Sequence, residues 1–180
     1  MKYLLILFIT LNLYASSIKE IYRLYEKQDY RQACLIGTKN LYKNKKDEDY
    51  LSLYAFSCLK SGYIDRLSTP IALLKSSKEA RSNSAYFSVI LMQKKLLYHS
   101  LVDGYSLKEL NLPTTDYILS KVFDLYIKNS NNIQKKSYIF KDIKDPTLSY
   151  KLYLFQDRRI TKMIIEEVRN NLTIKKHIYW

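Results

Sequence analysis

The sequence predicts a mainly α-helical protein with a small antiparallel β meander at its C-terminal end, α+β overall. Two observations predict the helices. The 180 residues include only three glycines and three prolines, too few for a turn-dense β-sandwich, and apolar side chains recur at helical spacing as far as about residue 131. A third observation predicts the meander, because apolar and polar side chains alternate in the C-terminal segment, 132–180.

The first 17 residues have the layout of a secretory signal peptide. Lys2 precedes an apolar run over residues 3–13, and small side chains at Ala15 and Ser17 stand where signal peptidase requires them. The run is too short for the alternative, an uncleaved membrane anchor, because a membrane span needs about 20 apolar residues. We therefore expect cleavage after Ser17, a mature chain that begins at Ile18 and has no transmembrane span, and a periplasmic location.

A predicted helical hairpin follows the signal peptide. Apolar side chains at Ile18, Ile21 and Leu24 recur at helical spacing and lead to a polar elbow at residues 27–29. The pattern predicts a second helix over residues 30–41, which returns along the first.

The next segment repeats this arrangement. A helix over residues 51–58 ends at an elbow at residues 60–63, and a return helix over Leu67 to Leu74 is expected to be interrupted by Pro70. The two elbows lie 34 residues apart, counted from Gln28 to Gly62.

This segment resembles a tetratricopeptide repeat protein. In such proteins an aromatic residue and a small residue three positions later follow the turn, as Tyr30 and Ala33 do here, and the repeat is 34 residues long. The resemblance covers residues 18 to about 75. It implies a concave groove that binds a partner protein or peptide and no shared enzymatic activity. Four tyrosines are the candidate groove contacts: Tyr22, Tyr25, Tyr50 and Tyr54.

Two more helices are predicted before the meander. One spans Ser84 to His99, and we expect its Lys94-Lys95 pair to face solvent. The other begins at residues 113–116, with Thr114 or Thr115 as its cap, and ends at the polar cluster 129–132. The predicted division is thus a signal peptide over 1–17, a helical domain over 18–131 and the meander over 132–180.

The meander is predicted from strands at 149–156 and 173–180, joined by a strand at 137–140. Residues 160–168 fit both a helical stripe and a strand. The turn at 169–171 favours the strand, because asparagine tolerates the left-handed backbone of a hairpin turn. The adjacent Glu166 and Glu167 would then point to opposite faces and pair with basic side chains of neighbouring strands: Lys151, Arg158, Lys175 or Lys176.

Cys34 and Cys58 are the two cysteines of the chain. The hairpin model places them on neighbouring helices, which leaves open either a disulfide or two buried thiols. A hydrolase that pairs one of them with His99 is an alternative that the predicted packing positions of both cysteines disfavour. The sequence contains no metal-ligand spacing, phosphate loop or dinucleotide fingerprint, so we expect no enzyme, no cofactor and no metal site.

A formal net charge of +13 is consistent with an anionic partner and equally with a solvated, lysine-rich surface that only keeps the protein soluble. An exported chain rarely meets nucleic acid, so none is expected. The function that we expect is a non-enzymatic adaptor that binds a protein or peptide in the bacterial cell envelope. The alternative is a module that recognises anionic glycan or lipid through basic and aromatic side chains near the C-terminus, the basic ones being Lys151, Arg158, Arg159, Lys175 and Lys176.

Overall fold

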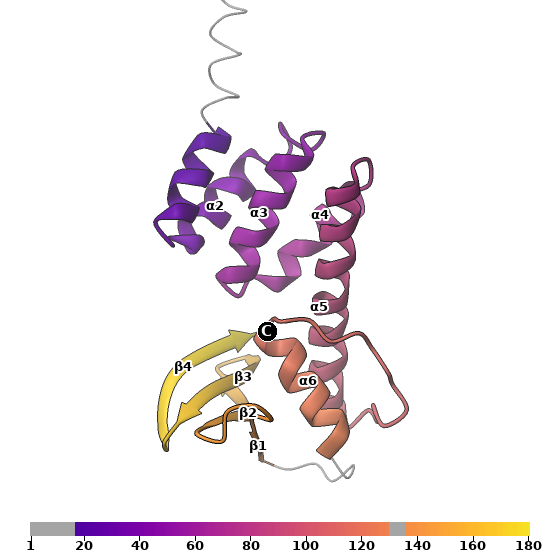
Figure 1. Cartoon of the computed structure of the whole chain (residues 1–180), viewed down its shortest axis with the longest axis vertical. Helices are drawn as coiled ribbons and strands as arrows, with labels where there is room; N and C mark the ends of the chain where they lie inside the picture. Colours follow the sequence, from indigo (N-terminus) through magenta and orange to yellow (C-terminus); the bar gives the residue numbers. More distant parts are fainter. Residues whose placement is uncertain (1–16, 130–135) are drawn as a thin grey trace, which may run out of the picture. The chain divides into compact units, whose positions relative to one another are not determined.

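The computed structural model describes residues 17–129 and 136–180. It confirms the predicted fold class, because helices and their connections occupy the described chain up to residue 129 and a four-stranded antiparallel sheet follows (Figure 1). The predicted signal peptide lies outside the described residues except for Ser17. By packing, the chain divides into two compact units, Met1–Ser88 and Val89–Trp180, so the boundary falls inside a long helix.

The first helical hairpin consists of a helix over residues 17–26 and α2, Tyr30–Asn40. The predicted elbow is confirmed: the backbone turns at Gln28, which has a positive φ of 59°, and the Asp29 side chain caps α2 by accepting from the Gln32 N–H at 3.2 Å. The Tyr25 and Tyr30 rings meet edge to face with centroids 5.0 Å apart. The aromatic residue after the turn therefore packs α2 onto the first helix.

The second hairpin consists of α3, Glu48–Lys60, a 3-10 helix η1, Ile64–Leu67, and α4, Ser68–Leu73. The expected interruption at Pro70 is wrong, because η1 passes directly into α4 with Leu67 and Ser68 in the right-handed helical region, and Pro70 lies within α4. Proline is tolerated in the first turn of a helix, where backbone N–H groups have no partner within the α-helix.

The core of the first unit lies between these helices. One cluster of buried side chains joins the first helix, α2 and α3 and consists of Ile21, Ala33, Cys34, Tyr50, Tyr54 and Cys58. Helices α2 and α3 approach closely at Gly37, whose carbonyl accepts a hydrogen bond from the Tyr50 hydroxyl at 2.9 Å. A small residue at this point lets the two helices pack side by side.

Helix α5 spans Lys78–Asp103 and extends from the first unit into the second. The predicted range, Ser84 to His99, was too short at both ends. The helix begins earlier because the Ser77 hydroxyl accepts from the Ala80 N–H at 3.0 Å and caps it, although the first turns are polar. The expectation for Lys94 was also wrong: Lys95 is exposed, but Lys94 is buried and donates to the main-chain oxygen of Trp180.

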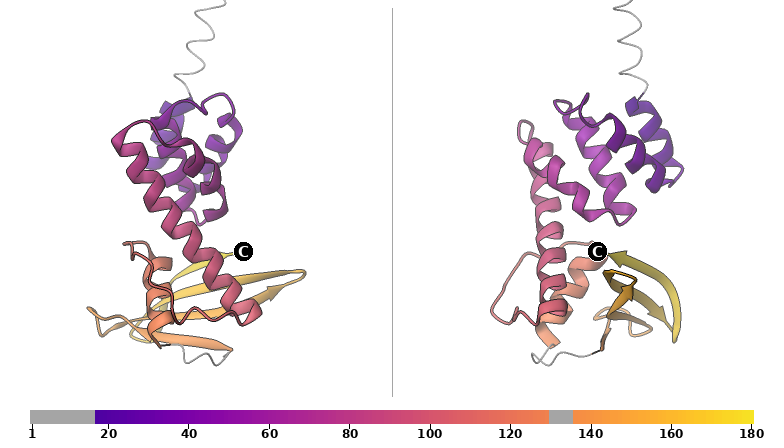
Figure 2. Two further views of the ribbon diagram at one scale, coloured as in Figure 1. Left: turned by 90° about the vertical axis from the view of Figure 1, so that its right-hand side faces the viewer. Right: turned by 180° about the vertical axis from the view of Figure 1, so that it is seen from behind.

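The second unit contains α6, Ile118–Asn129, which lies between α5 and the sheet (Figure 2). The predicted helix start at 113–116 was too early, because α6 begins at Ile118 and the Thr115 hydroxyl accepts from the Tyr117 N–H at 3.3 Å in the segment before it. Tyr126 joins the layers: its hydroxyl is 2.9 Å from the Ser100 hydroxyl of α5, and its ring packs edge to face on Tyr138 of the first strand.

The sheet is a simple meander in the order β1-β2-β3-β4, with every neighbouring pair antiparallel. The strands are β1, Ser137–Lys141; β2, Leu148–Asp157; β3, Ile160–Arg169; and β4, Leu172–Tyr179. The ambiguous segment 160–168 is thus a strand. The turn before β4 has the left-handed backbone expected of asparagine, with φ values of 49° at Asn170 and 66° at Asn171.

One face of the sheet is packed against the helices of the second unit. It carries the buried residues Tyr138, Phe140, Tyr150, Leu152, Met163, Ile165 and Tyr179. The opposite face, which we call the outer face, carries the alternate residues of β2, β3 and β4.

Candidate functional site

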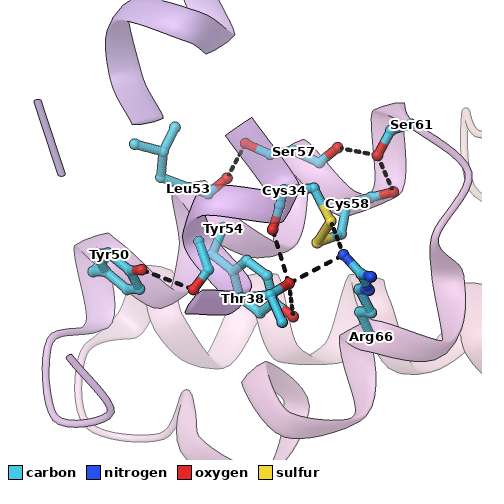
Figure 3. Close-up of a disulfide and its surroundings, with 10 residues drawn as sticks. Cys34, Thr38, Tyr50, Leu53, Tyr54, Ser57, Cys58, Ser61 and Arg66 are labelled. Atoms are coloured by element: carbon cyan, nitrogen blue, oxygen red, sulfur yellow. Dashed lines mark hydrogen bonds between the residues drawn. A yellow bond between two sulfur atoms is a disulfide. The ribbon is translucent and has the colours of Figure 1, made fainter. Parts of the chain in front are cut away.

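A disulfide joins Cys34 of α2 to Cys58 of α3 (Figure 3). Of the two possibilities that the sequence left open, the structure therefore contains the bond, and neither sulfur is a free thiol. The guanidinium of Arg66 lies against it, with Nη1 3.3 Å from Cys34 Sγ and 3.1 Å from Thr38 Oγ1. The bond and Arg66 together tie α2, α3 and η1 into one block.

The four candidate groove tyrosines do not share one surface. Tyr50 and Tyr54 are buried in the core, and burial raises the pKa of the Tyr50 hydroxyl well above its usual value. Tyr25 packs on Tyr30 at the elbow. Tyr22 alone among the four has a largely open side chain, 57% exposed. The two buried tyrosines hold the hairpins together and do not face an open groove.

Tyr22 lines an apolar groove between the first helix and α3. The groove has a volume of about 400 Å³ and is lined by Ile18, Lys19 and Tyr22 from the first helix and by Asp49 and Leu53 from α3. Ile18 and Leu53 form its floor, since both also pack against the core of the first unit. Lys19 and Asp49 supply one positive and one negative charge. The sequence pattern indicated Tyr22 but gave no sign of Leu53, which differs from its buried neighbours in α3 only by its position around the helix.

The same face of α3 continues toward α5. Phe56 lies one turn after Leu53 and contacts two aromatic rings of α5, with centroids 6.2 Å from Tyr86 and 4.8 Å from Phe87. Phe56 and Tyr86 are half-buried, so part of each ring stays open. The first helix, α3 and the start of α5 therefore present apolar and aromatic side chains from successive helices of the first unit.

The five basic residues that were predicted to recognise an anionic glycan or lipid do not share one face of the sheet. Lys151 and Lys176 lie on the outer face, whereas Lys175 lies on the opposite face, because neighbours on a strand alternate. Arg158 and Arg159 form the exposed turn between β2 and β3.

The acidic pair Glu166-Glu167 engages basic side chains, but of different types. The Glu166 carboxylate accepts from Lys176 Nζ and from the Tyr153 hydroxyl, each at 2.8 Å, and the Lys176 bond lowers the pKa of Glu166. The predicted partner Lys176 is thus confirmed. The Glu167 carboxylate instead lies 2.6 Å from Nε2 of His177, a partner that the sequence pattern did not predict.

A second cavity, of about 550 Å³, lies between the end of α6 and β1, where Leu125, Tyr138 and Phe140 contribute to its wall.

Among the described residues, no three His, Cys, Asp or Glu side chains come together closely enough to hold a metal ion. Within the same residues, no helix is both long and apolar enough to cross a membrane.

The fold and these surfaces define an α+β protein with paired N-terminal helices, an apolar groove and a β meander. The chain matches no family model, no curated protein and no solved structure.

Proposed function

We propose that this protein is an exported, non-enzymatic adaptor of the bacterial cell envelope that holds a partner polypeptide in the groove between its first helix and α3. The observation that carries the proposal is the groove itself: Ile18, Tyr22 and Leu53 form an apolar surface that is open to solvent. Exposed aromatic side chains beside aliphatic ones are typical of the centre of protein interfaces.

The groove suits a peptide segment with an apolar side chain flanked by charged groups. An apolar anchor would fill the space beside Tyr22, while Lys19 and Asp49 at the rim would pair with an acidic and a basic group of the partner. Because the groove holds only about 400 Å³, it accommodates one or two side chains, and the rest of the partner would extend along Phe56 and Tyr86.

Two features support export. The first 17 residues have the pattern of a signal peptide, and the Cys34–Cys58 disulfide is a kind of bond that persists in oxidising compartments such as the periplasm.

Affinity capture from an envelope extract tests the proposal when two matched variants are compared. Tyr22→Asp places a charge in the groove, whereas Tyr42→Asp places the same charge on a loop of the same unit, where Tyr42 is 81% exposed. We expect the wild type and Tyr42→Asp to retain one stoichiometric polypeptide that Tyr22→Asp loses. Equal capture by all three proteins, or no stoichiometric partner for any of them, would refute the groove as the binding site.

A further inference from the structure

The outer face of the sheet carries three rows of side chains that cross β2, β3 and β4. Directly paired residues of antiparallel strands share a face, so each row consists of neighbours. The rows are Phe155 and Lys162, which Trp180, directly after β4, joins through its ring beside Lys162; Tyr153, Ile164 and Ile178; and Lys151, Glu166 and Lys176. An apolar middle row is therefore flanked by two rows that carry lysines.

The apolar side chains at the rim of this face are open to solvent. Phe155 is 53% exposed, Trp180 50% and Ile178 40%, and Ile139 of β1, opposite Lys151, is 69% exposed. In contrast, Ile164 on the central strand is buried between Tyr153 and Ile178. These exposed apolar side chains surround the buried Ile164 and form a contiguous apolar patch. Such patches mark interaction surfaces.

The cations of the patch are held close to its aromatic rings. Lys162 Nζ lies 5.8 Å from the Trp180 ring centroid, and Lys151 Nζ lies 5.3 Å from that of Tyr153. The neighbouring turn adds Arg158 and Arg159 at the end of the patch that carries Phe155.

Basic charge prevails at this surface. Its carboxylates are already engaged: Glu166 is buried and bound by Lys176, and Asp157 pairs with Lys162 at 2.5 Å. Lys151 and the two turn arginines remain as positive charge in excess over these pairs, so an anionic surface complements the patch.

We propose that this outer face binds the surface of an anionic lipid bilayer, independently of the groove on the first unit. Phe155, Trp180 and Ile178 would enter the boundary between headgroups and acyl chains, while Lys151 and the turn arginines contact anionic headgroups. Aliphatic side chains such as Ile139 and Ile178 favour a bilayer over an anionic glycan, because a sugar needs hydrogen-bonding groups where these residues offer only hydrocarbon.

Trp180 provides a direct test, because it is the single tryptophan of the chain. The mature chain is mixed with vesicles of phosphatidylglycerol and phosphatidylethanolamine, and with vesicles of phosphatidylcholine alone. We expect the anionic vesicles to shift Trp180 emission to shorter wavelength and brominated lipid to quench it. Added salt should reverse both effects, since it screens charge attraction.

Two variants with the same change in net charge separate this face from the general basicity of the protein. Lys151, Lys162 and Lys176 are changed to Glu in one, and Lys43, Lys45 and Lys46, in the exposed loop after α2, are changed to Glu in the other. The first should weaken vesicle binding about 100-fold, and the second should change it only slightly. Should the first variant not fold by circular dichroism, Arg158→Asn with Arg159→Ser alters the turn alone and should weaken binding about 30-fold.

The proposal is overturned by any one of four results. One is an emission spectrum of Trp180 that anionic vesicles leave unchanged. Another is equal binding to anionic and neutral vesicles, and the third is equal loss of binding in the outer-face and loop variants. A partner protein that occupies this face, detected by crosslinking while vesicles do not bind, would overturn it as well.

Discussion

Gly37 of α2 lies so close to Tyr54 of α3 that a β-carbon added to the glycine would be 2.5 Å from Cδ2 of the tyrosine ring. Real β-carbons do not approach a neighbour that closely, so the absence of a side chain at Gly37 sets the distance between the two helices. This contact therefore packs α2 of the first hairpin closely against α3 of the second.

Replacement of Gly37 by alanine should therefore destabilise the protein. Overpacking of a filled core costs about 1–3 kcal/mol, whereas the better helix propensity of alanine returns up to about 1 kcal/mol. We expect a net loss of up to about 2 kcal/mol in chemical denaturation followed by far-ultraviolet circular dichroism. In a Tyr54→Leu background the same change should be neutral or stabilising. A Gly37→Ala change with the same effect in both backgrounds would contradict the close contact.

The disulfide should contribute strongly to the stability of the helical unit. Cys34 and Cys58 are separated by 24 positions, and a loop of that length gives about 3 kcal/mol in the chain-entropy model. We expect the Cys34→Ala and Cys58→Ala double variant to lose about this amount in urea titrations, and to be insensitive to reductant. A wild-type protein whose unfolding midpoint does not change with reductant would contradict this prediction.

Glu48 should make stability depend on pH between about 4.5 and 2. Its carboxylate accepts from the backbone N–H groups of Lys75, Ser76 and Ser77 at 2.7–2.9 Å, and these bonds lower its pKa from 4.5 to about 2. A depressed pKa means that the folded state favours the ionised form. The stabilisation is therefore complete above pH 4.5 and is lost as the pH falls toward 2.

A Glu48→Gln variant tests this dependence. It should be less stable than the wild type at pH 7, and the difference should shrink as the pH falls toward 2. Glu79→Gln, which removes an exposed carboxylate in the first turn of α5, serves as the control. A stability difference between wild type and Glu48→Gln that stays constant from pH 7 to pH 2 would argue against stabilisation by hydrogen bonds to the ionised Glu48 carboxylate.

Processing of the N-terminus is the direct test of export. We expect the chain purified from the periplasm to begin at Ile18, as determined by N-terminal sequencing or intact mass. Cleavage after Ser17 would leave Ile18, a wall residue of the groove, at the start of the mature protein. Recovery of a product that still begins at Met1 from the cytosol would contradict the proposed location.

Local sequence patterns predicted the elements and their turns. Tyr30 and Ala33 after the elbow indicated close packing of α2 on the first helix, and Ala33 is fully buried while the Tyr30 ring meets Tyr25. Asn170 and Asn171 indicated a hairpin turn and adopt the left-handed backbone that asparagine tolerates. These features depend on residues close in sequence, so a single chain suffices to predict them.

Features that depend on distant contacts could not be predicted. Lys94 is buried where a main-chain oxygen 86 residues away accepts a hydrogen bond from its ammonium group, and nothing in the sequence distinguishes Lys94 from the exposed Lys95. Tyr50 and Tyr22 are both tyrosines in predicted helices, but Tyr50 is buried in the core and Tyr22 lines the groove. The composition of the outer face likewise follows from strand register, which becomes definite only when the strands are paired.

The central claim is that the groove beside Tyr22 holds a partner polypeptide, and site-specific photocrosslinking in intact cells tests it most directly. A photoreactive phenylalanine derivative is placed at position 22 in one strain and at position 42, on the exposed loop, in another. We predict one crosslinked polypeptide at position 22, with attachment near an apolar side chain of the partner, and none at position 42. The absence of any product at position 22, or the same products at both positions, would contradict the account.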